Sequence, residues 1–512
     1  MAQETPVSDE GGSGVRLPSL LDSLIPVIAL MALLALSYFL FGSSASSGPN
    51  QVALLFCGTI AAGIAYKNGM PWDGIRQAAV DGVAAGLPAI MILLAVGALI
   101  GTWSLSGTIV AMIYYGLKIL SPNFFYATTA LVCAVVGFSI GSSWTVAGTI
   151  GIGLIGIAIS MNLSPAITAG AIISGAYFGD KASPLSDTAN LATATAGSGI
   201  YTHIRESLWT SLPSLFLAVV IFAFLGAPGD FDASRALARI GALVVISPWV
   251  FLPFLFVVGL SLVRFPPFVT IFVGALVGGI VACFHDPSRV IAFAGDPALP
   301  SALAFLKGVW SAMATGYTFR SGDVALDTIM TRGGMSSMMN TVWLIISALA
   351  FGAILEHAGL LNRLIAPIVD RAKSIGGLVA TLVATCIGAN LLTSDQYIAI
   401  ALPGRLFRPI FAKRGLAPVL LSRVLGDSAT VTSPLIPWNS CGAYMAATLG
   451  VPTTAYFAFC FFNFLNPMFT ILFAAFGLRV LKVAARSDRN GDADSSQGAA
   501  MAEPPDHTGR AY

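Results

Sequence analysis

The stretch "GDKASPLSDTANLA" (residues 179–192) places three ionisable side chains between two strongly apolar runs. Gly179 and Pro184 both oppose a continuous helix, glycine by its flexibility and proline because it lacks an N–H and blocks the preceding turn. A helix that breaks here leaves backbone carbonyls free at membrane depth. The stretch therefore predicts a broken helix with a polar site at the break, in a chain that spans a membrane.

The composition agrees with this prediction. Of the 512 residues, 56% are hydrophobic and only 10% are charged, with a mean hydropathy of +0.83. Ordinary soluble domains carry about a quarter charged residues. The chain is therefore predicted to be an all-α polytopic membrane protein located in the cell (inner) membrane. The net charge of +2 gives no reason to expect nucleic acid as a partner. The six cysteines form no CxxC pair, and no cofactor is expected.

Apolar runs divide the chain into two transmembrane halves with polar segments around them. The predicted parts are a disordered N-terminal tail (1–18), a first half (19–226), a polar linker (227–239), a second half (240–486) and a disordered C-terminal tail (487–512). Several runs are shorter than the roughly 20 residues that span a bilayer. Short, interrupted runs of this kind indicate broken helices and re-entrant hairpins.

Four short motifs recur in order at a spacing of about 250 residues, which indicates an internal repeat. The pairs are "GALI" (97–100) with "GAIL" (352–355), "GSSW" (141–144) with "TSDQ" (393–396), "LSPA" (163–166) with "LAPV" (416–419), and "SPL" (183–185) with "SPL" (433–435). Both halves also contain a Gly-Asp pair, but aligning Asp180 with Asp427 needs a gap that the SPL alignment does not. Two interpretations stay open: the two aspartates are equivalent, or they are only analogous.

Charge predicts opposite orientations for the two halves. The loop 404–418 holds four basic residues, whereas its counterpart 151–165 holds no charge. The positive-inside rule makes the first loop cytoplasmic and the second external, which is an inverted-topology repeat. The segment between the basic loops is too short for two spans, so a re-entrant hairpin is predicted with its tip at 393–396. Its partner in the first half would turn at 141–144.

Oxygen-rich side chains surround both predicted breaks, as a site for a hard cation requires. The proposed ion-binding oxygens belong to Ser183, Thr188, Asn190, Thr432, Ser433 and Asn439, and the residues expected to hold the metal ion itself are Asp187, Asn190 and Asn439. The candidate residues for proton and ion coupling are Asp180, Asp187, Asp427, Asp395 and Glu356. A carboxylate inside a membrane indicates a functional site unless it has a structural role, because its burial costs several kcal/mol.

Each carboxylate also has a structural interpretation. Lys181 would neutralise Asp180 next to it, and Arg423 would neutralise Asp427 one turn later. Asp187 has no such cation, so replacing it by Asn is expected to abolish ion-dependent proton movement. For Asp395, at the hairpin tip, ion coupling and solvation in a loop stay equally open. For Glu356, a proton relay and a helix end at the interface stay open.

Catalysis fits the sequence poorly. The GxSxG match "GFSIG" (137–141) lacks the strand–turn–helix context of a nucleophile elbow. A remote alternative is an intramembrane aspartyl protease in which Asp180 and Asp427 share a proton. The oxygen-rich surroundings have no evident use in peptide hydrolysis, so no residue is assigned a catalytic role and the chain is expected not to be an enzyme.

The stretches "FGDKASPLSDTANLA" (178–192) and "DSATVTSPLIPWNSCGAYM" (427–445) closely resemble the NhaC family of Na⁺/H⁺ antiporters. Further similar segments are "GTWSLSGTIVAMIYYGLKIL" (101–120), "TRGGMSSM" (331–338) and "SDQYIAIALPGRLF" (394–407). The resemblance implies exchange of Na⁺, and of Li⁺ as a second cation, for H⁺ by alternating access. It leaves a second function open, because similar proteins exchange organic acids such as malate and lactate together with Na⁺ and protons. The expected partners are Na⁺, H⁺ and membrane lipid, with a homodimer as an assembly to test.

Overall fold

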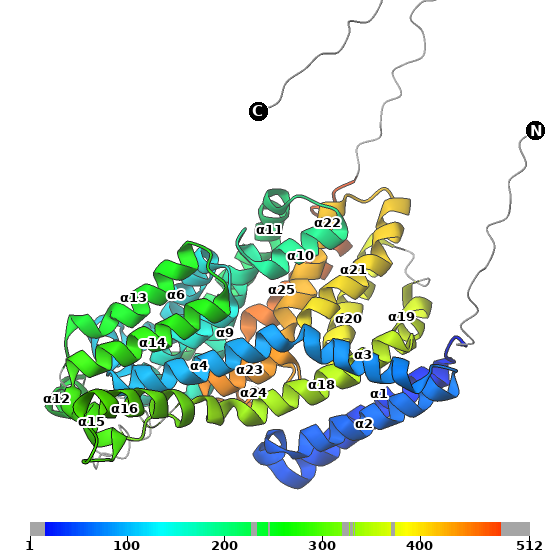
Figure 1. Ribbon diagram of the computed structural model, residues 1–512. Coiled ribbons are helices and arrows are strands. Elements are labelled where there is room, and N and C mark those ends of the chain that lie inside the picture. The colour runs from blue at the N-terminus through cyan, green and yellow to red at the C-terminus, as the bar shows by residue number, and fades with distance from the viewer. Residues whose placement is uncertain are drawn as a thin grey trace, which may run out of the picture.

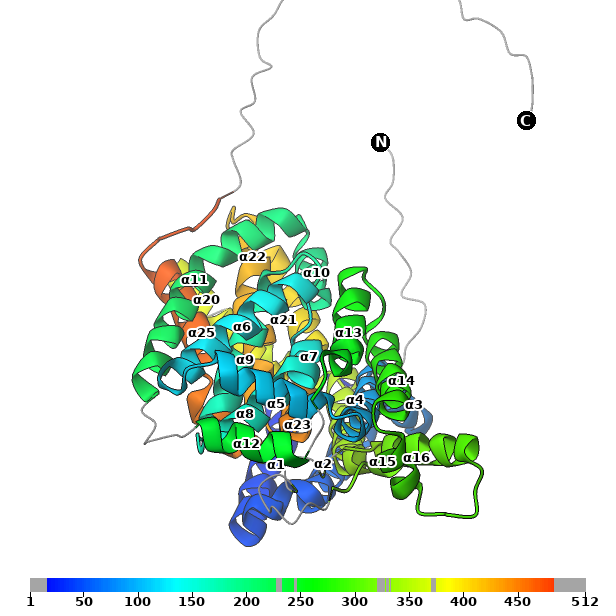
Figure 2. The same cartoon turned by 90° about the vertical axis from the view of Figure 1, so that its left-hand side faces the viewer.

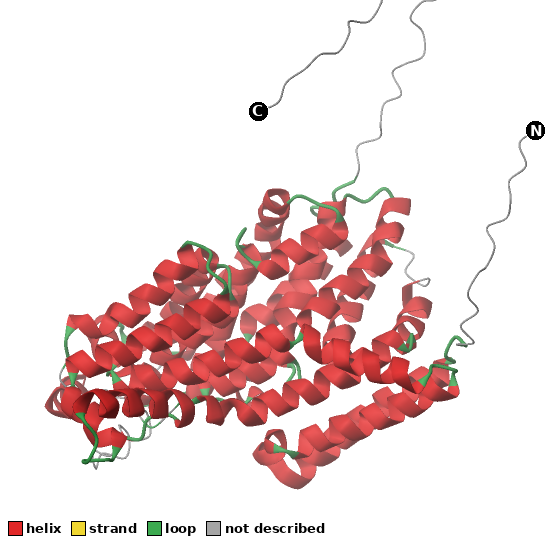
Figure 3. Ribbon diagram, viewed as in Figure 1, coloured by secondary structure: helices red, strands yellow, loops and turns green. Residues whose placement is uncertain are grey.

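The computed structural model describes residues 16–226, 233–243, 246–319, 327, 331, 333–369 and 374–482. Within these ranges the chain folds into helices and short helical turns without a strand, and an isolated β-bridge pairs Leu416 with Lys482 (Figure 3). Nine of the described helices are long and apolar enough to cross a membrane, or ten if one bent pair forms a single span. The prediction of an all-α, multi-pass membrane protein is confirmed. Apart from residues 16–18, the predicted terminal tails lie outside the described residues.

Corresponding spans follow one another in the same order in the two halves, although some spans that are one helix in one half are divided in the other. In the first half these are α4 (Leu87–Leu105), α5 (Thr108–Ile119), α6 (Phe125–Ile140), α7 (Ser143–Val146), α8 (Ile152–Ser160), α9 (Pro165–Ala182), α10 (Asp187–Ala196) and α11 (Ile200–Leu225). In the second half they are α18 (Met339–His357), α19 (Leu360–Val369), α20 (Ile375–Thr393), α21 (Gln396–Lys413), α22 (Pro418–Leu425), α23 (Ser440–Leu449), α24 (Thr453–Tyr456) and α25 (Phe461–Ala475). A π-helical turn joins α7 to α8 (Ala147–Gly151), and a second one follows α22 (Gly426–Thr430).

Helix ends recur at a spacing of 253 residues. Gly141 and Ser394 both adopt left-handed backbone conformations directly after α6 and α20. Ser186 and Asn439 both cap the following short helix, each through a side-chain oxygen that accepts a backbone N–H. At this spacing Asp180 corresponds to Ser433, and Asp427 to Ser174. The alignment of helix ends therefore favours the interpretation that the two aspartates are analogous and not equivalent.

The remaining helices pack around this repeat. They are α1 (Leu20–Phe41), α2 (Pro49–Lys67), α3 (Trp72–Ala85), α12 (Ala233–Leu243), α13 (Leu252–Leu262), α14 (Pro267–His285), α15 (Pro287–Ala294) and α16 (Ser301–Thr315). Helices α2 and α3 pack on α18, and α14 and α16 pack on α4. Figure 1 shows α12, α15 and α16 gathered at one end of the molecule, and α1 and α2 at the other. Helix α12 begins inside the segment that the sequence had predicted to be a polar linker.

Each half covers the break of the other. Helix α10, which follows the break in the first half, contacts α21 and α22, and α23, which follows the break in the second half, contacts α8 and the π turn before it (Figure 2). The ring of Trp144 stacks on Tyr444 with centroids 4.0 Å apart, and the Tyr444 hydroxyl donates to the Trp144 carbonyl. Side chains at one break are consequently positioned by helices of both halves.

The inverted orientation of the two halves gives a testable prediction. After Cys283, the one described cysteine that is not fully buried, is replaced by Ser, single cysteines at the exposed positions Asn162 and Lys413 are expected to react from opposite sides of the membrane. The position of the basic loop predicts that the cysteine at 413 is cytoplasmic. The measurement is labelling of oriented cells with a membrane-impermeant maleimide before and after permeabilisation. Equal labelling of both positions from one side would contradict the inverted plan.

Candidate functional site

Local sequence explains why the first half breaks where it does. Helix α9 ends at Ala182, and Ser183 continues in an extended conformation. Pro184 has no N–H to donate to the preceding turn. The chain re-enters a helix at Ser186, whose hydroxyl accepts the N–H of Ala189. The predicted break is therefore present, between Ala182 and Ser186.

Asp180 lies in the last turn of α9 and points toward this break. Its carboxylate is buried, with 3% of the residue exposed. It accepts hydrogen bonds from the Ser143 N–H (3.1 Å), the Ser143 hydroxyl (2.6 Å) and the Ser186 hydroxyl (2.6 Å), and a longer one from Thr188 (3.4 Å). We call these four residues the Asp180 cluster. In the part of the chain that the structure describes, no basic side chain forms an ion pair with Asp180.

The alternative interpretation, in which Lys181 neutralises Asp180, is therefore wrong. Consecutive residues of a helix point about 100° apart, so Lys181 leaves α9 on another side. Its ammonium group forms a fully buried ion pair with Asp427 of the second half. The predicted pair of Arg423 with Asp427 is also absent, because Arg423 pairs with Glu206 instead, at 4.0 Å. The π turn that begins at Gly426 changes the helical register between Arg423 and Asp427.

Asp427 is held by more groups than Lys181 alone. The Thr210 hydroxyl donates to both of its carboxylate oxygens (3.1 and 2.9 Å), the Asn466 amide donates at 2.9 Å, and Thr470 donates as well. Lys181 in turn donates to the Ser211 hydroxyl at 2.5 Å. This carboxylate has a cation and three neutral donors, so its charge is compensated inside the protein. The two aspartates of the Gly-Asp pairs thus have opposite electrostatic environments.

Asp187 lies at the edge of the Asp180 cluster. It is the first residue of α10, it is exposed, and it accepts a 2.6 Å hydrogen bond from the hydroxyl of Tyr397 in α21. It lines a cavity of about 330 Å³ together with Ser142, Asn190 and Arg264. Since Ser142 and Asp187 directly adjoin Ser143 and Ser186, this cavity lies close to the Asp180 cluster.

The structure does not bring the three predicted metal-binding residues together. The Asn190 amide is exposed and donates to the carbonyls of Pro184 and Ser186 within its own segment. Asn439 is buried and donates to the backbone and side-chain oxygens of Asn390. Asp187 is bonded to neither of them. Among the described residues, no group of three or more His, Cys, Asp or Glu side chains could hold a metal ion.

Most polar side chains at the second break bond to one another or to nearby backbone, whereas the buried hydroxyl of Thr430 has no partner. The Asn390 amide donates to the Ala429 carbonyl and to Thr432, and the Asn439 side chain caps α23. Ser433 donates to the Thr430 carbonyl at 2.8 Å and lies 3.4 Å from the Gln396 side chain. Ser183, at the first break, accepts the N–H of Leu185. These oxygens fix the shape of the breaks, and none of them bonds to a carboxylate.

The other two predicted coupling residues occupy helix ends. Asp395 is buried and caps α21 by accepting the N–H groups of Tyr397 and Ile398. The predicted turn at 393–396 is therefore present between α20 and α21. Glu356 lies in the last turn of α18, is partly exposed and pairs with Arg405 at 3.5 Å. Its surroundings are those of a helix end, which was one of the two interpretations of this residue.

Several residues of the site were not singled out from the sequence. They are Ser143, Tyr397, Asn390, Thr210, Glu206, Asn466 and Thr470. Ser143 belongs to the "GSSW" motif whose turn was predicted, so a hydroxyl directed toward the first break could have been suspected. The others contact the site from α11, α20, α21 and α25, and no local pattern connects them to it.

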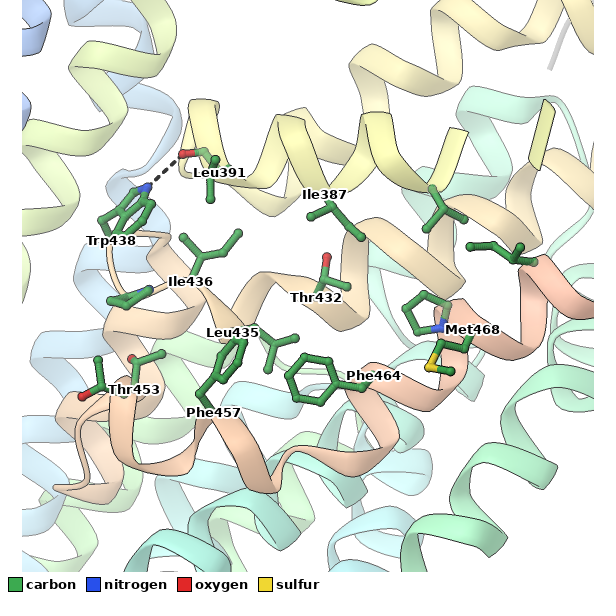
Figure 4. Close-up of a pocket in the computed structure, with 15 residues that line it drawn as sticks. Ile387, Leu391, Thr432, Leu435, Ile436, Trp438, Thr453, Phe457, Phe464 and Met468 are labelled. Carbon is green, nitrogen blue, oxygen red and sulfur yellow. Dashed lines mark hydrogen bonds between the residues drawn. The ribbon is translucent and has the colours of Figure 1, made fainter. Parts of the chain in front are cut away.

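A further cavity, next to the second break, is lined by no charged group. It measures about 680 Å³ and lies between α20, the second break and α25 (Figure 4). Apolar side chains such as Ile387, Leu435, Phe464 and Met468 form most of its lining. The indole N–H of Trp438 donates to the Leu391 carbonyl at its edge. The lining also includes Thr432, Thr453 and Thr454, but it has no carboxylate to balance the charge of a small cation.

Known proteins are similar to the chain along most of its length. Residues 175–478 match the model of the Na⁺/H⁺ antiporter family. The Na⁺/H⁺ antiporter NhaC of Alkalihalophilus pseudofirmus is 36% identical, over 86% of this chain and 93% of its own, and NhaC of Bacillus subtilis is also 36% identical, over 79% and 87%. A malate-2H⁺/Na⁺-lactate antiporter of Bacillus subtilis is 31% identical, over 90% of this chain and 96% of its own.

Proposed function

The chain belongs to the Na⁺/H⁺ antiporter family, and from this membership we propose that it exchanges Na⁺ for H⁺ across the cell membrane, with Asp180 as the carboxylate that holds either ion. One observation carries the assignment of the site. Asp180 is buried, no described basic side chain pairs with it, and three hydroxyl groups donate to its carboxylate. Of the other buried aspartates, Asp22 and Asp427 pair with lysines, and Asp395 caps α21. An uncompensated carboxylate in a membrane protein is stabilised either by a proton or by a bound cation.

The Asp180 cluster has the ligands that Na⁺ prefers. The carboxylate and the hydroxyl oxygens of Ser143, Ser186 and Thr188 converge within hydrogen-bonding distance, and hard cations bind such oxygen sets. When Na⁺ occupies the cluster, these hydroxyls turn their lone pairs toward it. When a proton occupies Asp180, the carboxyl group remains within the same hydroxyl shell. Because one carboxylate serves both ions, each is released when the other binds.

Access to the cluster runs through the cavity beside Asp187. Asp187 is exposed on this cavity, so its negative charge attracts Na⁺ toward the break. Helices of both halves surround the cluster, since α10 packs on α21 and α22. A relative displacement of the two halves would therefore open Asp180 to one side and then to the other, as alternating access requires.

A second candidate is the exchange of an organic anion together with these cations. The sequence motifs offer Lys181 and Arg423 as cations, and both pair with carboxylates in the structure. Arg264 lines the Asp187 cavity and forms no ion pair with any described residue. A guanidinium group in this position could bind a carboxylate. This observation justifies an experiment that separates the two cargoes.

The cargo experiment uses purified protein in proteoliposomes with an imposed pH gradient. Addition of Na⁺ or Li⁺ alone is expected to collapse the gradient, because a bare cation needs only the oxygens of the Asp180 cluster. The readout is a fluorescent pH probe, and protein-free liposomes are the control. Collapse that occurs only after malate, lactate or an amino acid is also added would contradict simple cation exchange and favour the second candidate.

A further inference from the structure

The proposed exchange leaves one buried titratable side chain without a role. His203 lies in the first turn of α11 with none of its surface exposed. Its Nδ1 is 3.0 Å from the Ser422 hydroxyl, and its Nε2 is 3.4 Å from the Ser207 hydroxyl. Both ring nitrogens therefore have hydroxyl neighbours that are able to donate or to accept a proton. Histidine is the side chain whose ordinary titration falls closest to physiological pH.

Charges from several elements face this imidazole. Lys181 of α9, Asp427 of the π turn and Arg423 of α22 all act on it electrostatically. A Cβ atom placed on Gly426 would lie 3.5 Å from both the His203 Cε1 and the Lys181 Cε. The His203 ring and the Lys181 side chain therefore both lie next to this glycine.

Beyond Arg423, the same network continues to Glu206 of α11. Glu206 is in turn 3.8 Å from the half-exposed Arg479, which follows α25. A positive charge on the His203 ring would therefore act directly on the Asp427–Lys181 pair. The other charged groups of this region are Arg423, Glu206 and Arg479.

A short hydrogen-bonded path leads from His203 toward the surface. The Ser198 hydroxyl donates to the Ser422 hydroxyl at 2.9 Å, and Ser422 is the Nδ1 partner of His203. Ser198 is half-buried in the turn between α10 and α11, beside exposed Gly197. The Arg408 guanidinium lies against that glycine, and Arg408 belongs to the basic loop predicted to be cytoplasmic. The path thus joins this end of the molecule to the interior.

We propose that His203 takes up a proton from this path beside the Asp427–Lys181 pair, and that this proton controls Na⁺ release at Asp180, an inference that rests on the proposed exchange function. The Ser422 hydroxyl donates to the Val419 carbonyl at 3.1 Å, and it first turns from this carbonyl to Nδ1. A proton then passes from Ser198 to Ser422 and from Ser422 to Nδ1, and each hydroxyl takes up one proton as it gives one away. The neutral ring, with its proton on Nε2 beforehand, becomes an imidazolium. Only O–H and N–H bonds change, and the proton leaves by the reverse steps.

The position of Lys181 connects this proton to Na⁺. An imidazolium beside the buried pair attracts Asp427 and repels Lys181, so it weakens their ion pair. Lys181 directly follows Asp180 in the last turn of α9. A change in the position of Lys181 therefore moves the backbone that holds the Asp180 carboxylate against Ser143 and Ser186. Proton loading at His203 and Na⁺ release at Asp180 are coupled through this single helical turn.

The test compares His203→Gln and Ser422→Ala with wild type in two assays. In proteoliposomes, His203→Gln is expected to lower Na⁺-driven proton flux by about 100-fold, as the loss of a positioned proton-transfer group does, and to flatten its dependence on external pH. Ser422→Ala, which keeps the imidazole but interrupts the path, is expected to lower the flux as well. In detergent, the rise of Tm on adding Na⁺ is expected to remain in both variants, because the Asp180 cluster is intact.

Ser347→Ala is the matched control. Ser347 is also buried and donates to the carbonyl of the preceding turn, but it lies in α18, away from the path. Wild-type flux and pH dependence in His203→Gln would overturn the proposal. Loss of the Na⁺-induced Tm rise together with the flux would overturn it too, because the ring would then support the fold and not carry protons.

Failure of the exchange function itself would be distinguishable from failure of this proposal. It would appear as the absence of Na⁺-dependent flux in the wild type. The imidazole NMR signals of the Na⁺-free protein, assigned by comparison with His203→Gln, then still test His203. A ring that takes up a proton shifts its signals with a midpoint between about pH 5 and pH 8, whereas signals that do not move across this range would overturn the proposal.

Discussion

Asp180→Asn is expected to abolish Na⁺-dependent proton movement while the protein still inserts and folds. The amide keeps the size of the carboxyl group and one oxygen acceptor for the hydroxyls of Ser143 and Ser186. It has no charge to attract Na⁺ and does not take up a proton at physiological pH, so neither ion of the exchange has its binding group. The measurement is collapse of an imposed pH gradient on adding Na⁺, with the amount of folded protein determined by size-exclusion chromatography.

Two further substitutions are needed to interpret the result for Asp180→Asn. Asp73→Asn is the matched control, since Asp73 is an exposed carboxylate of α3 that pairs only with Arg76, and wild-type exchange is expected. Asp187→Asn is expected to raise the Na⁺ concentration needed for half-maximal exchange and to leave the maximal rate largely intact, because Asp187 lies at the rim. Full exchange by Asp180→Asn, or loss of all exchange in Asp187→Asn alone, would move the site to Asp187, where the sequence had placed it.

Local patterns predicted the architecture around the site well. Pro184 predicted the first break, whereas Gly179 lies inside α9 and does not interrupt it. The "GSSW" and "TSDQ" motifs predicted the two turns after α6 and α20. Each of these features is decided by a few consecutive residues whose backbone preferences are strong. The resemblance to the NhaC family is confirmed by membership in the Na⁺/H⁺ antiporter family.

The partners of the charges could not be predicted in the same way. Neighbours in sequence suggested the pairs Lys181 with Asp180 and Arg423 with Asp427, but the observed partners lie 246 and 217 residues away in the chain. Two local features cause the difference: consecutive side chains diverge around α9, and a π turn follows Arg423. Contacts between the halves then decide which aspartate is neutralised. Of these two aspartates, Asp180 is therefore the one without a cation as its partner.

Removing either member of the Lys181–Asp427 pair is expected to destabilise the protein severely. Both side chains are at most 1% exposed, so Lys181→Met leaves a buried carboxylate, and Asp427→Asn leaves a buried ammonium group. Breaking a buried ion pair from one side costs about 3–5 kcal/mol, because the remaining charge stays in a medium of low dielectric constant. The measurement is the unfolding midpoint of the purified protein in mixed detergent micelles.

The double substitution separates charge burial from packing. Lys181→Met combined with Asp427→Asn removes both charges and leaves Thr210, Asn466 and Thr470 with an amide oxygen to bond, so most of the lost stability is expected to return. Lys307→Met, which breaks a half-exposed pair with Asp296, is the control, and its effect is expected to stay below about 1 kcal/mol. If the double variant were as unstable as the sum of the single ones, the two side chains would act independently. The buried pair would then not be what holds the last turn of α9 against the second half, and proton and Na⁺ binding would need another connection.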